Sequence, residues 1–315
     1  MERRMLGNSG LEVAPLIFGG NVFGWTVDQS RAFRLLDAFV SSGFNCIDTA
    51  DSYSTWVPGN RGGESETMIG EWMGLRKNRE RVVIATKVGS DLGAGRKGLS
   101  KAYILKAVED SLRRLQTTTI DLYQTHRDDA GTPVEETLEA YALLVKEGKV
   151  RAIGASNMSP ARLSESLDAA AQGGLPAYQA FQPHYNLCER EGYERELEPL
   201  CRARNLSVIP YYPLASGFLT GKYRSESDLS KSVRGAGVRK YLNARGFRIL
   251  AALDDVAGRH AASPAAVALA WLLARPGITA SIVSATSERQ WEDLASAPSL
   301  RLDSASIGTL NSASA

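Results

Sequence analysis

Short apolar runs alternate with longer amphipathic segments along most of the chain. The short runs are typical of buried strands, which we expect at residues 16–18, 46–48, 82–87, 121–125, 150–155, 180–181, 207–210 and 280–283. The longer segments space their apolar positions as helices do; Phe33, Leu36 and Phe39 show this spacing. We therefore expect helices at residues 30–42, 64–73, 100–115, 133–147, 159–172, 193–204, 264–274, 287–296 and 304–310.

This order of elements favours a closed barrel. Strands that alternate with helices form parallel sheets, and eight such units in about 300 residues fit an α/β fold of the (β/α)8 type, the TIM barrel. Before the first unit, residues 3–6 and 11–13 flank a Gly-Asn-Ser-Gly turn and predict an N-terminal β-hairpin that closes the bottom of the barrel. The Gly-, Ser- and Arg-rich stretch 213–246 is too long for an ordinary connection, which predicts a functional or mobile loop.

Composition and charge narrow the class of protein. The 315 residues, 43% of them hydrophobic, fit one domain over residues 1–315. A net charge of +2 gives no reason to expect nucleic acid or a membrane surface as a partner. The longest apolar run, 265–274, is too short to cross a bilayer, and no secretory signal is visible. Three cysteines without metal-ligand spacing predict a reduced, cytoplasmic protein that holds no metal.

Four ionisable side chains fall where parallel barrels place their chemistry. Active sites of such barrels lie at the carboxyl ends of the strands and in the loops that follow. Asp48 and Lys87 end two expected strands, His126 follows a third, and Tyr53 lies in the loop after Asp48. Each has a simpler explanation alone: a loop cap, packing, a solvated charge or a buried imidazole. Their occurrence together at successive strand ends favours a catalytic group.

Six ordered segments carry a resemblance to a known family. They are Asp-Thr-Ala-Asp-Ser-Tyr at 48–53, Ala-Thr-Lys at 85–87, Asp-Leu-Tyr-Gln-Thr-His-Arg at 121–127, Gly-Ala-Ser-Asn at 154–157, Gln-Pro-His-Tyr-Asn-Leu at 182–187 and Tyr-Tyr-Pro-Leu-Ala at 211–215. In these segments the chain resembles the aldo-keto reductases, and the match runs from about residue 3 to residue 300. The resemblance implies a barrel enzyme that reduces aldehydes or ketones with NADPH and, in reverse, oxidises alcohols with NADP+.

The residues make chemical sense in those roles. Reducing a carbonyl by hydride transfer needs a proton donor at the nascent alkoxide, and a free tyrosine has a pKa of about 10. We expect the Lys87 ammonium to lower the pKa of Tyr53, and Asp48 to keep Lys87 charged and in place. The resemblance assigns these roles to the three residues and gives His126 the task of orienting the substrate oxygen.

The resemblance also implies a cofactor site. Ser156, Asn157 and Gln182 would hold the nicotinamide carboxamide, and Tyr211 would stack on the ring. The pyrophosphate would lie under residues 214–222, at Leu214, Ser216, Gly217 and Lys222. Arg234 would stack on the adenine. Residues 156–157 also fit a turn with a helix cap, and Arg234 also fits a solvated loop charge.

The last expected loop departs from the common pattern of the family. Many members have Gly-Ala-Arg/Lys-Ser, whereas residues 284–287 are Ser-Ala-Thr-Ser, and Leu294 replaces an asparagine. Recognition of the 2′-phosphate of NADPH would then rest on Ser287, Arg289 and Gln290, with Arg289 as the main contact. The run 93–98 matches Gly-x-Gly-x-x-Gly, but it does not follow directly on a strand, so we interpret it as a flexible basic loop.

The sequence says less about the substrate and the partners than about the catalytic and cofactor residues. Phe23, Trp25 and Trp56 predict an apolar or sugar-stacking wall above the barrel mouth, or packing on the rim. Arg127 would meet an anionic group or pair with Asp128. We expect a small carbonyl or sugar-like substrate, an open pocket, and a monomer or weak homo-oligomer. Two alternatives remain: a nucleotide-binding redox sensor resembling potassium-channel β subunits, and a Schiff-base aldolase that uses Lys87.

Overall fold

The structure is a computed structural model and describes residues 2–315. Eight parallel strands lie side by side in the order β10-β3-β4-β5-β6-β7-β8-β9. A bridge from Val208 to Ile278 and a hydrogen bond of 2.9 Å from Thr279 N to the Val208 carbonyl join β9 to the β10 side. The predicted barrel is therefore confirmed. Its strands are β3 (Leu16–Gly19), β4 (Cys46–Asp48), β5 (Val83–Val88), β6 (Ile120–Thr125), β7 (Val150–Ser156), β8 (Ala180–Gln182), β9 (Ser207–Val208) and β10 (Ser281–Val283).

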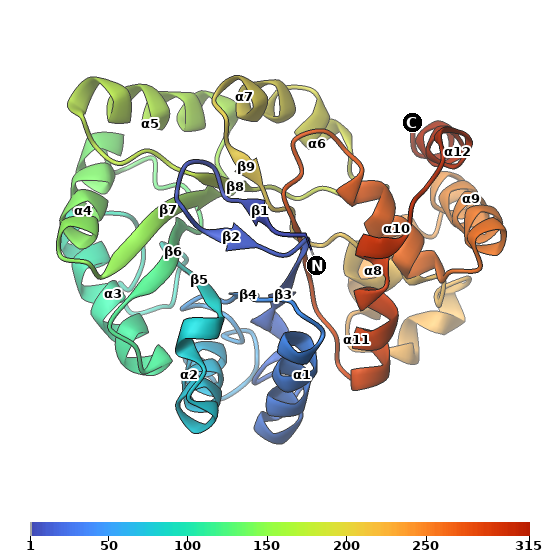
Figure 1. Ribbon diagram of the computed structural model, residues 1–315, viewed down its shortest axis with the longest axis horizontal. Helices are drawn as coiled ribbons and strands as arrows, with labels where there is room; N and C mark the ends of the chain where they lie inside the picture. Colours follow the sequence, from blue (N-terminus) through green and yellow to red (C-terminus); the bar gives the residue numbers. More distant parts are fainter. Residues whose placement is uncertain (1) are drawn as a thin grey trace.

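Helices surround the strands on the outside (Figure 1). Side-chain caps begin several of them, with Asp28, Ser100, Ser159 and Ser263 each accepting a backbone N–H of the first turn. Those that follow the strands are α1 (Gln29–Ser41), α2 (Glu64–Arg76), α3 (Lys101–Leu115), α4 (Val134–Lys146), α5 (Pro160–Gly173), α6 (Glu191–Glu194), α7 (Leu197–Ala203), α10 (Pro264–Leu273) and α11 (Glu288–Ala295). The last helix is α12 (Ser304–Ser314). No helix within residues 2–315 is long and apolar enough to cross a membrane.

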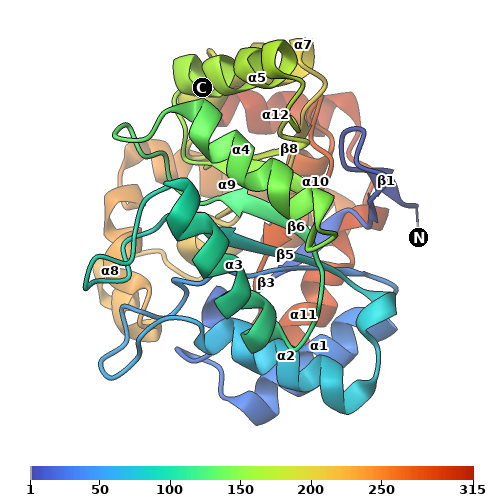
Figure 2. The same ribbon diagram turned by 90° about the vertical axis from the view of Figure 1, so that its left-hand side faces the viewer.

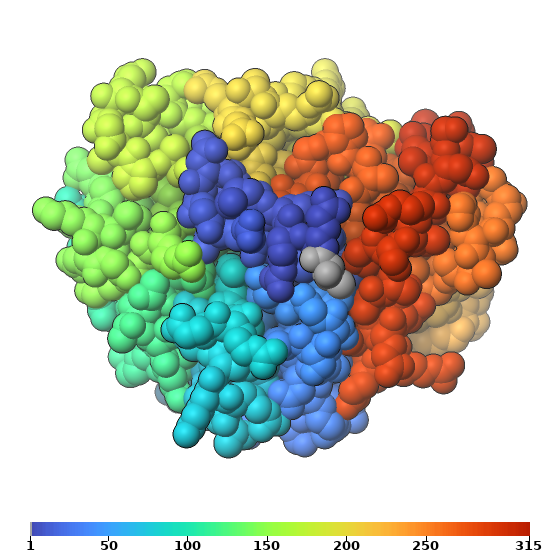
Figure 3. All heavy atoms as spheres, in the orientation of Figure 1, coloured from blue at the N-terminus to red at the C-terminus, as the bar shows by residue number. Residues whose placement is uncertain are grey.

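The predicted hairpin closes one end of the barrel. Its strands, β1 (Arg4–Met5) and β2 (Glu12–Val13), are shorter than expected. Leu6, Leu11 and Val13 are buried together with inward-facing strand residues such as Ala85 and Leu122. The hairpin lies across the centre of the face seen in Figure 3. Figure 2 shows β1 at one end of the molecule and α8 (Gly235–Val238) at the other.

The long connection predicted over residues 213–246 contains short helical segments rather than extended loop. They are η3 (Ala215–Thr220), η4 (Glu226–Lys231), α8 and η5 (Arg239–Tyr241). The sequence interpretation missed the next element, α9 (Ala244–His260), which Asn243 caps by accepting the Gly246 N–H. It also predicted one helix over 193–204, where the structure has α6 and α7.

Two glycines of α9 give a matched test of the packing at its start. A Cβ on Gly246 would lie 1.9 Å from the Tyr241 carbonyl oxygen, whereas a Cβ on Gly258 would meet nothing within 4 Å. We expect Gly246→Ala to lower the free energy of unfolding by about 1–3 kcal/mol, because the backbone must shift. Gly258→Ala should raise it by about 0.5–1 kcal/mol through helix propensity. Urea unfolding of both variants checks this; equal effects would contradict the close approach at Gly246.

Candidate active site

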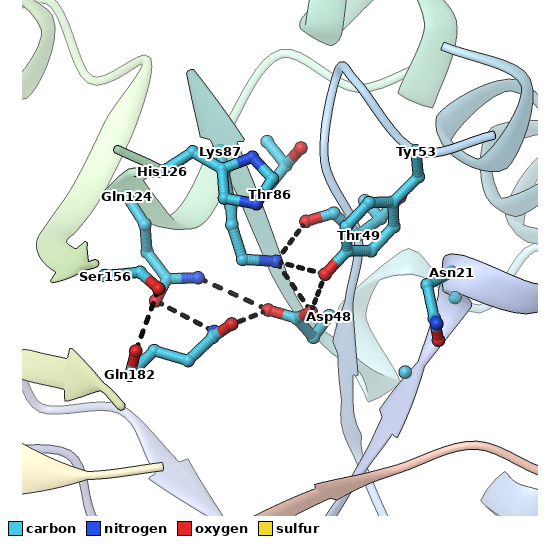
Figure 4. A network of polar contacts seen from close by, with 12 residues as sticks. Asn21, Asp48, Thr49, Tyr53, Thr86, Lys87, Gln124, His126, Ser156 and Gln182 are labelled. Atoms are coloured by element: carbon cyan, nitrogen blue, oxygen red, sulfur yellow. Dashed lines mark hydrogen bonds and ion pairs between the residues drawn. The ribbon is translucent and has the colours of Figure 1, made fainter. Parts of the chain in front are cut away.

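The sheet register brings the four predicted catalytic side chains to one edge of the barrel. Asp48 is the last residue of β4 and pairs with Ala85 of β5, two residues before Lys87. His126 directly follows β6, and Tyr53 lies in the loop after β4. Because the strands are parallel, their carboxyl ends share one face, and Figure 4 shows the four side chains converging there. The structure therefore brings together the group that the sequence singled out.

Lys87 is the centre of this group. It is fully buried, and its Nζ donates hydrogen bonds to Asp48 Oδ2 at 2.7 Å, the Thr49 carbonyl at 2.8 Å and Tyr53 Oη at 2.8 Å. These three bonds engage every N–H of an ammonium group. The amine nitrogen is therefore held in one place directly beneath the tyrosine hydroxyl.

Asp48 is fixed on both of its oxygens. Oδ2 accepts from Lys87 and, at 3.0 Å, from Tyr53 Oη. Oδ1 accepts from Gln182 Nε2 at 3.0 Å and Gln124 Nε2 at 3.4 Å. Gln124 lies on β6 inside the barrel and was missed by the sequence interpretation, although its inward position follows from the alternation along that strand.

The structure reverses the expectation for the Tyr53 hydroxyl. Burial raises the pKa of Tyr53 well above its usual value, and the neighbouring Asp48 carboxylate raises it further. Burial also lowers the pKa of Lys87, against the opposing effect of Asp48. The Lys87 ammonium therefore does not outweigh desolvation here, and Tyr53 keeps its proton. That state suits a proton donor.

His126 is a neutral imidazole in this setting. Burial lowers its pKa well below the usual value, and the positive charges of Lys87 and Arg127 lower it further. Its Nδ1 lies 3.2 Å from the hydroxyl of Ser52, which leaves Nε2 for a ligand. Ser52 was not among the residues predicted from sequence, although it lies in the same loop as Tyr53.

A cavity of about 960 Å³ opens above the four side chains. Tyr53 and His126 line it, while Asp48 and Lys87 lie beneath its floor. Most of the predicted cofactor residues line it as well: Ser156, Asn157, Gln182, Tyr211, Leu214, Ser216, Gly217, Lys222, Arg234 and Gln290. The cavity therefore joins the predicted catalytic and cofactor residues in one space.

Next to His126, the predicted nicotinamide residues form a connected network. Asn157 has a left-handed φ of 51°, and its Nδ2 donates to the His126 carbonyl at 2.9 Å. Tyr211 Oη donates to Asn157 Oδ1 at 2.9 Å, and the Tyr211 ring stacks on His184 with centroids 5.2 Å apart. Ser156 Oγ donates to the Gln182 carbonyl at 2.8 Å. Residues 156–157 thus make a rigid turn, and the cap of α5 is Ser159 instead.

The segment after β9 forms a turn suited to an anion. Ser216 and Gly217 have consecutive positive φ values of 58° and 98°. The Lys222 ammonium would lie 3.5 Å from a Cβ on Gly217, so the cation folds back over this turn. The Arg234 Nη2 atom is buried without a hydrogen-bond partner in residues 2–315, and burial lowers the pKa of this guanidinium. The turn at Ser216 and Gly217, with the Lys222 cation beside it, has the character of a site for phosphate groups.

The other end of the cavity differs in part from the prediction. Ser287 caps α11 by accepting the Gln290 N–H, and Gln290 Oε1 accepts from Thr286 N. Arg289 is exposed and is not among the described residues that line the cavity, whereas Arg31 of α1 is. Arg31 was missed because its place at the cavity depends on the closure of the barrel.

The predicted aromatic wall needs a correction. Phe23 is fully buried and stacks on Phe18 with centroids 5.5 Å apart, so it belongs to the core. Trp25 lies beneath the Arg234 guanidinium at 5.0 Å and meets Trp56 edge to face at 5.6 Å. Only Trp56, 50% exposed, lines the cavity among the described residues of this set.

The glycine-rich run 93–98 lies elsewhere. None of its residues is among the described residues that line the cavity. The three glycines have φ values of 75°, 76° and 86°, which fit a tight surface turn. The geometry agrees with the interpretation of this run as a loop rather than a pyrophosphate site.

Comparison with known proteins identifies the family. The model of the Aldo/keto reductase family matches residues 15–315. The chain belongs to this family and is an oxidoreductase of the aldo-keto reductase type.

Relatives include an uncharacterised oxidoreductase, YrpG, of Bacillus subtilis (strain 168), 35% identical over 99% of this chain and 95% of the relative. The versiconal hemiacetal acetate reductase of Aspergillus parasiticus is 34% identical over 88% and 86%. A probable voltage-gated potassium channel subunit beta of Oryza sativa subsp. japonica is 33% identical over 92% and 89%. Both an enzyme and a channel subunit are thus among the similar proteins.

A second buried carboxyl lies beside the site. Asp51 is 2% exposed, and neither of its oxygens has a hydrogen-bond partner in residues 2–315. Burial raises its pKa well above the usual value, and the nearby Glu66 carboxylate raises it further. The folded protein therefore holds a proton on Asp51 that the unfolded chain, with a pKa of about 3.9, releases.

This proton predicts a pH-dependent stability. A raised carboxyl pKa contributes stability that is present below about pH 4 and is lost as the pH rises to the folded-state value, at about 1.4 kcal/mol per pH unit. We expect the unfolding free energy of Asp51→Asn to rise relative to that of the wild type between pH 5 and pH 7. Urea unfolding across this range checks it. The exposed control Asp255→Asn should keep the wild-type slope, and a parallel profile for Asp51→Asn would contradict a protonated Asp51.

Proposed function

We propose that the protein reduces an aldehyde or ketone with NADPH, and oxidises the corresponding alcohol in reverse. The observation that carries this proposal is the Tyr53 hydroxyl, which stands at the cavity floor 2.8 Å from Lys87 Nζ and beside the neutral His126. Such a hydroxyl is positioned to give a proton to the oxygen of a bound carbonyl.

The chain's own residues fit a nicotinamide dinucleotide, which supplies a hydride when bound. Ser156, Asn157 and Gln182 would hold the carboxamide, and Tyr211 would lie against the ring. The turn at Ser216 and Gly217, together with Leu214 and Lys222, would take the pyrophosphate. Support comes from the positive φ values of this turn and from the unpartnered Nη2 of Arg234, which would meet the adenine side. Ser287, Arg289 and Gln290 would meet the 2′-phosphate.

The residues at the cavity floor would each have a separate role in proton transfer. Tyr53 releases its proton to the carbonyl oxygen as that oxygen becomes an alcohol. The phenolate left behind is stabilised by the Lys87 ammonium, whose position the Asp48 carboxylate fixes. His126, through Nε2, donates a hydrogen bond that holds the carbonyl oxygen near Tyr53. In the oxidation direction, the same phenolate accepts the proton of the alcohol.

The geometry speaks against an aldolase and leaves a second candidate function. A Schiff base needs a free amine, but the Lys87 nitrogen donates all three of its hydrogens to Asp48, Thr49 and Tyr53. The relatives named as potassium channel subunits favour the other candidate, a nucleotide-binding regulatory protein with weak turnover. Steady turnover separates this candidate from the enzyme.

Tyr53→Phe tests the proposed function directly. The substitution removes only the hydroxyl, so we expect turnover of a simple aldehyde to fall about 10²–10⁴-fold. Cofactor affinity should be unchanged, because the proposed nicotinamide contacts come from other residues. Aldehyde-dependent loss of nicotinamide absorbance and a fluorescence titration of NADPH measure the two effects. Tyr103→Phe, on α3 outside the cavity, is the matched control; wild-type turnover in Tyr53→Phe would rule out the proton donor.

The preference for NADPH over NADH gives a second test. The two cofactors differ by one phosphate, and a hydrogen bond to a charged group contributes about 1.5–3 kcal/mol, or roughly ten- to a hundred-fold in affinity. We expect Arg289→Ala to weaken NADPH binding and to leave NADH nearly unchanged. The effect of Arg31→Ala on the two affinities is compared with that of Arg289→Ala, because Arg31 lines the cavity and Arg289 is not among the described residues that do. Calorimetric titration with NADPH and with NADH measures these affinities. A wild-type protein that binds NADH as tightly as NADPH would refute the preference.

A further inference from the structure

One cation at the catalytic end of the cavity has no structural partner. Arg127 directly follows His126, is exposed, and lines the cavity. Within residues 2–315 its guanidinium takes part in no hydrogen bond or ion pair, unlike most arginines of the chain. The residue before it is fixed by its main chain, because the His126 N–H donates to the Val88 carbonyl at 2.8 Å and the His126 carbonyl accepts from Asn157 Nδ2 at 2.9 Å.

The two aspartates that follow Arg127 in the sequence, and Asp91 of the cavity lining, all have other partners. Asp128 Oδ1 accepts from Arg162 Nε at 3.0 Å, so the ion pair with Asp128 considered from the sequence does not form. Asp129 accepts from the Leu99 N–H and the Thr132 hydroxyl. Asp91 accepts from the Gly93 N–H and pairs with Lys97 at 3.5 Å. The Arg127 charge is therefore left for something outside the chain.

The position of Arg127 separates it from the other cations of the cavity. Lys222 and Arg234 belong to the connection after β9, and Arg31 to α1. Arg127 instead adjoins His126, and its positive charge contributes to the low pKa of that imidazole. An anion beside Arg127 would thus belong to the molecule whose carbonyl faces His126, not to the dinucleotide.

We propose that Arg127 binds a carboxylate carried by the substrate, so that the preferred substrates are aldehydes or ketones with an acidic group. The proposal rests on the proposed function of the same site. A guanidinium binds a carboxylate through two parallel hydrogen bonds, which gives orientation as well as affinity. Trp56, half exposed on the cavity rim, offers an apolar surface to the carbon skeleton between the two groups.

Two aldehydes of nearly equal shape test the assignment: 4-carboxybenzaldehyde, which is anionic, and 4-formylbenzamide, which is neutral. We expect wild-type kcat/KM to favour the anion by roughly ten- to a hundred-fold, mainly through KM, and added salt to reduce this ratio. Arg127→Ala should abolish the preference while keeping turnover of the neutral aldehyde. Arg127→Lys should retain part of it, because the charge remains without the bidentate geometry. Arg113→Ala, which removes an exposed charge of α3, should keep the wild-type ratio.

The outcomes separate the two proposals. A wild-type enzyme that turns over both aldehydes equally well, or an Arg127→Ala variant that loses both equally, overturns the carboxylate site and leaves the proposed function standing. If neither aldehyde is turned over, the result counts against the proposed reduction of aldehydes. Calorimetric binding of benzoate against benzamide to the protein loaded with NADP+ then decides the site: benzoate binding that is tighter and lost in Arg127→Ala supports it, and equal binding of the two ligands refutes it.

Discussion

The ion pair between Lys87 and Asp48 is the interaction on which the rest of the site depends. Both side chains are buried, at 0% and 1% exposure, with 2.7 Å between Nζ and Oδ2. Burying two charges is costly unless every polar atom is hydrogen-bonded. Here the pair recruits a main-chain carbonyl, two glutamine amides and the Tyr53 hydroxyl. Those partners come from several strands and the loop after β4, so the pair is fully hydrogen-bonded only where these segments meet in the barrel.

The sequence predicts those features of the structure that depend on residues close together in the chain. Strand ends and family-like motifs are local, and Asp48, Lys87 and His126 were found from them. The stacking of Phe23 on Phe18 and the contact of Arg31 with the cavity are set by packing between distant elements, which no local pattern reveals. Helix α9 was missed for another reason: it begins with Ala-Arg-Gly, a weak start for a helix, and only the tight approach of Gly246 to Tyr241 explains that glycine.

The direction in which the pKa of Tyr53 shifts could not be predicted from residue types alone. A lysine beside a tyrosine suggests an acidified phenol, but the balance depends on burial and on which oxygen the hydroxyl faces. Tyr53 donates to Asp48 and accepts from Lys87, so a negative and a positive neighbour act on it together. With desolvation added, the proton is retained. The protonated form is the one that the proposed reduction would require, and a phenolate would gain from Lys87 only once the proton has left.

Two other ionisable groups at or beside the floor, besides the Lys87–Asp48 pair, are held in their neutral forms. His126 is neutral and Asp51 holds its proton, because burial disfavours their ionised forms. Basic side chains line the same cavity, among them Arg127, Lys222 and Arg234. Under the proposed function, a neutral carbonyl would approach an uncharged donor at the floor, and anionic groups would bind to the basic side chains instead. In that proposal, proton transfer and the binding of anionic groups would use different residues of one cavity.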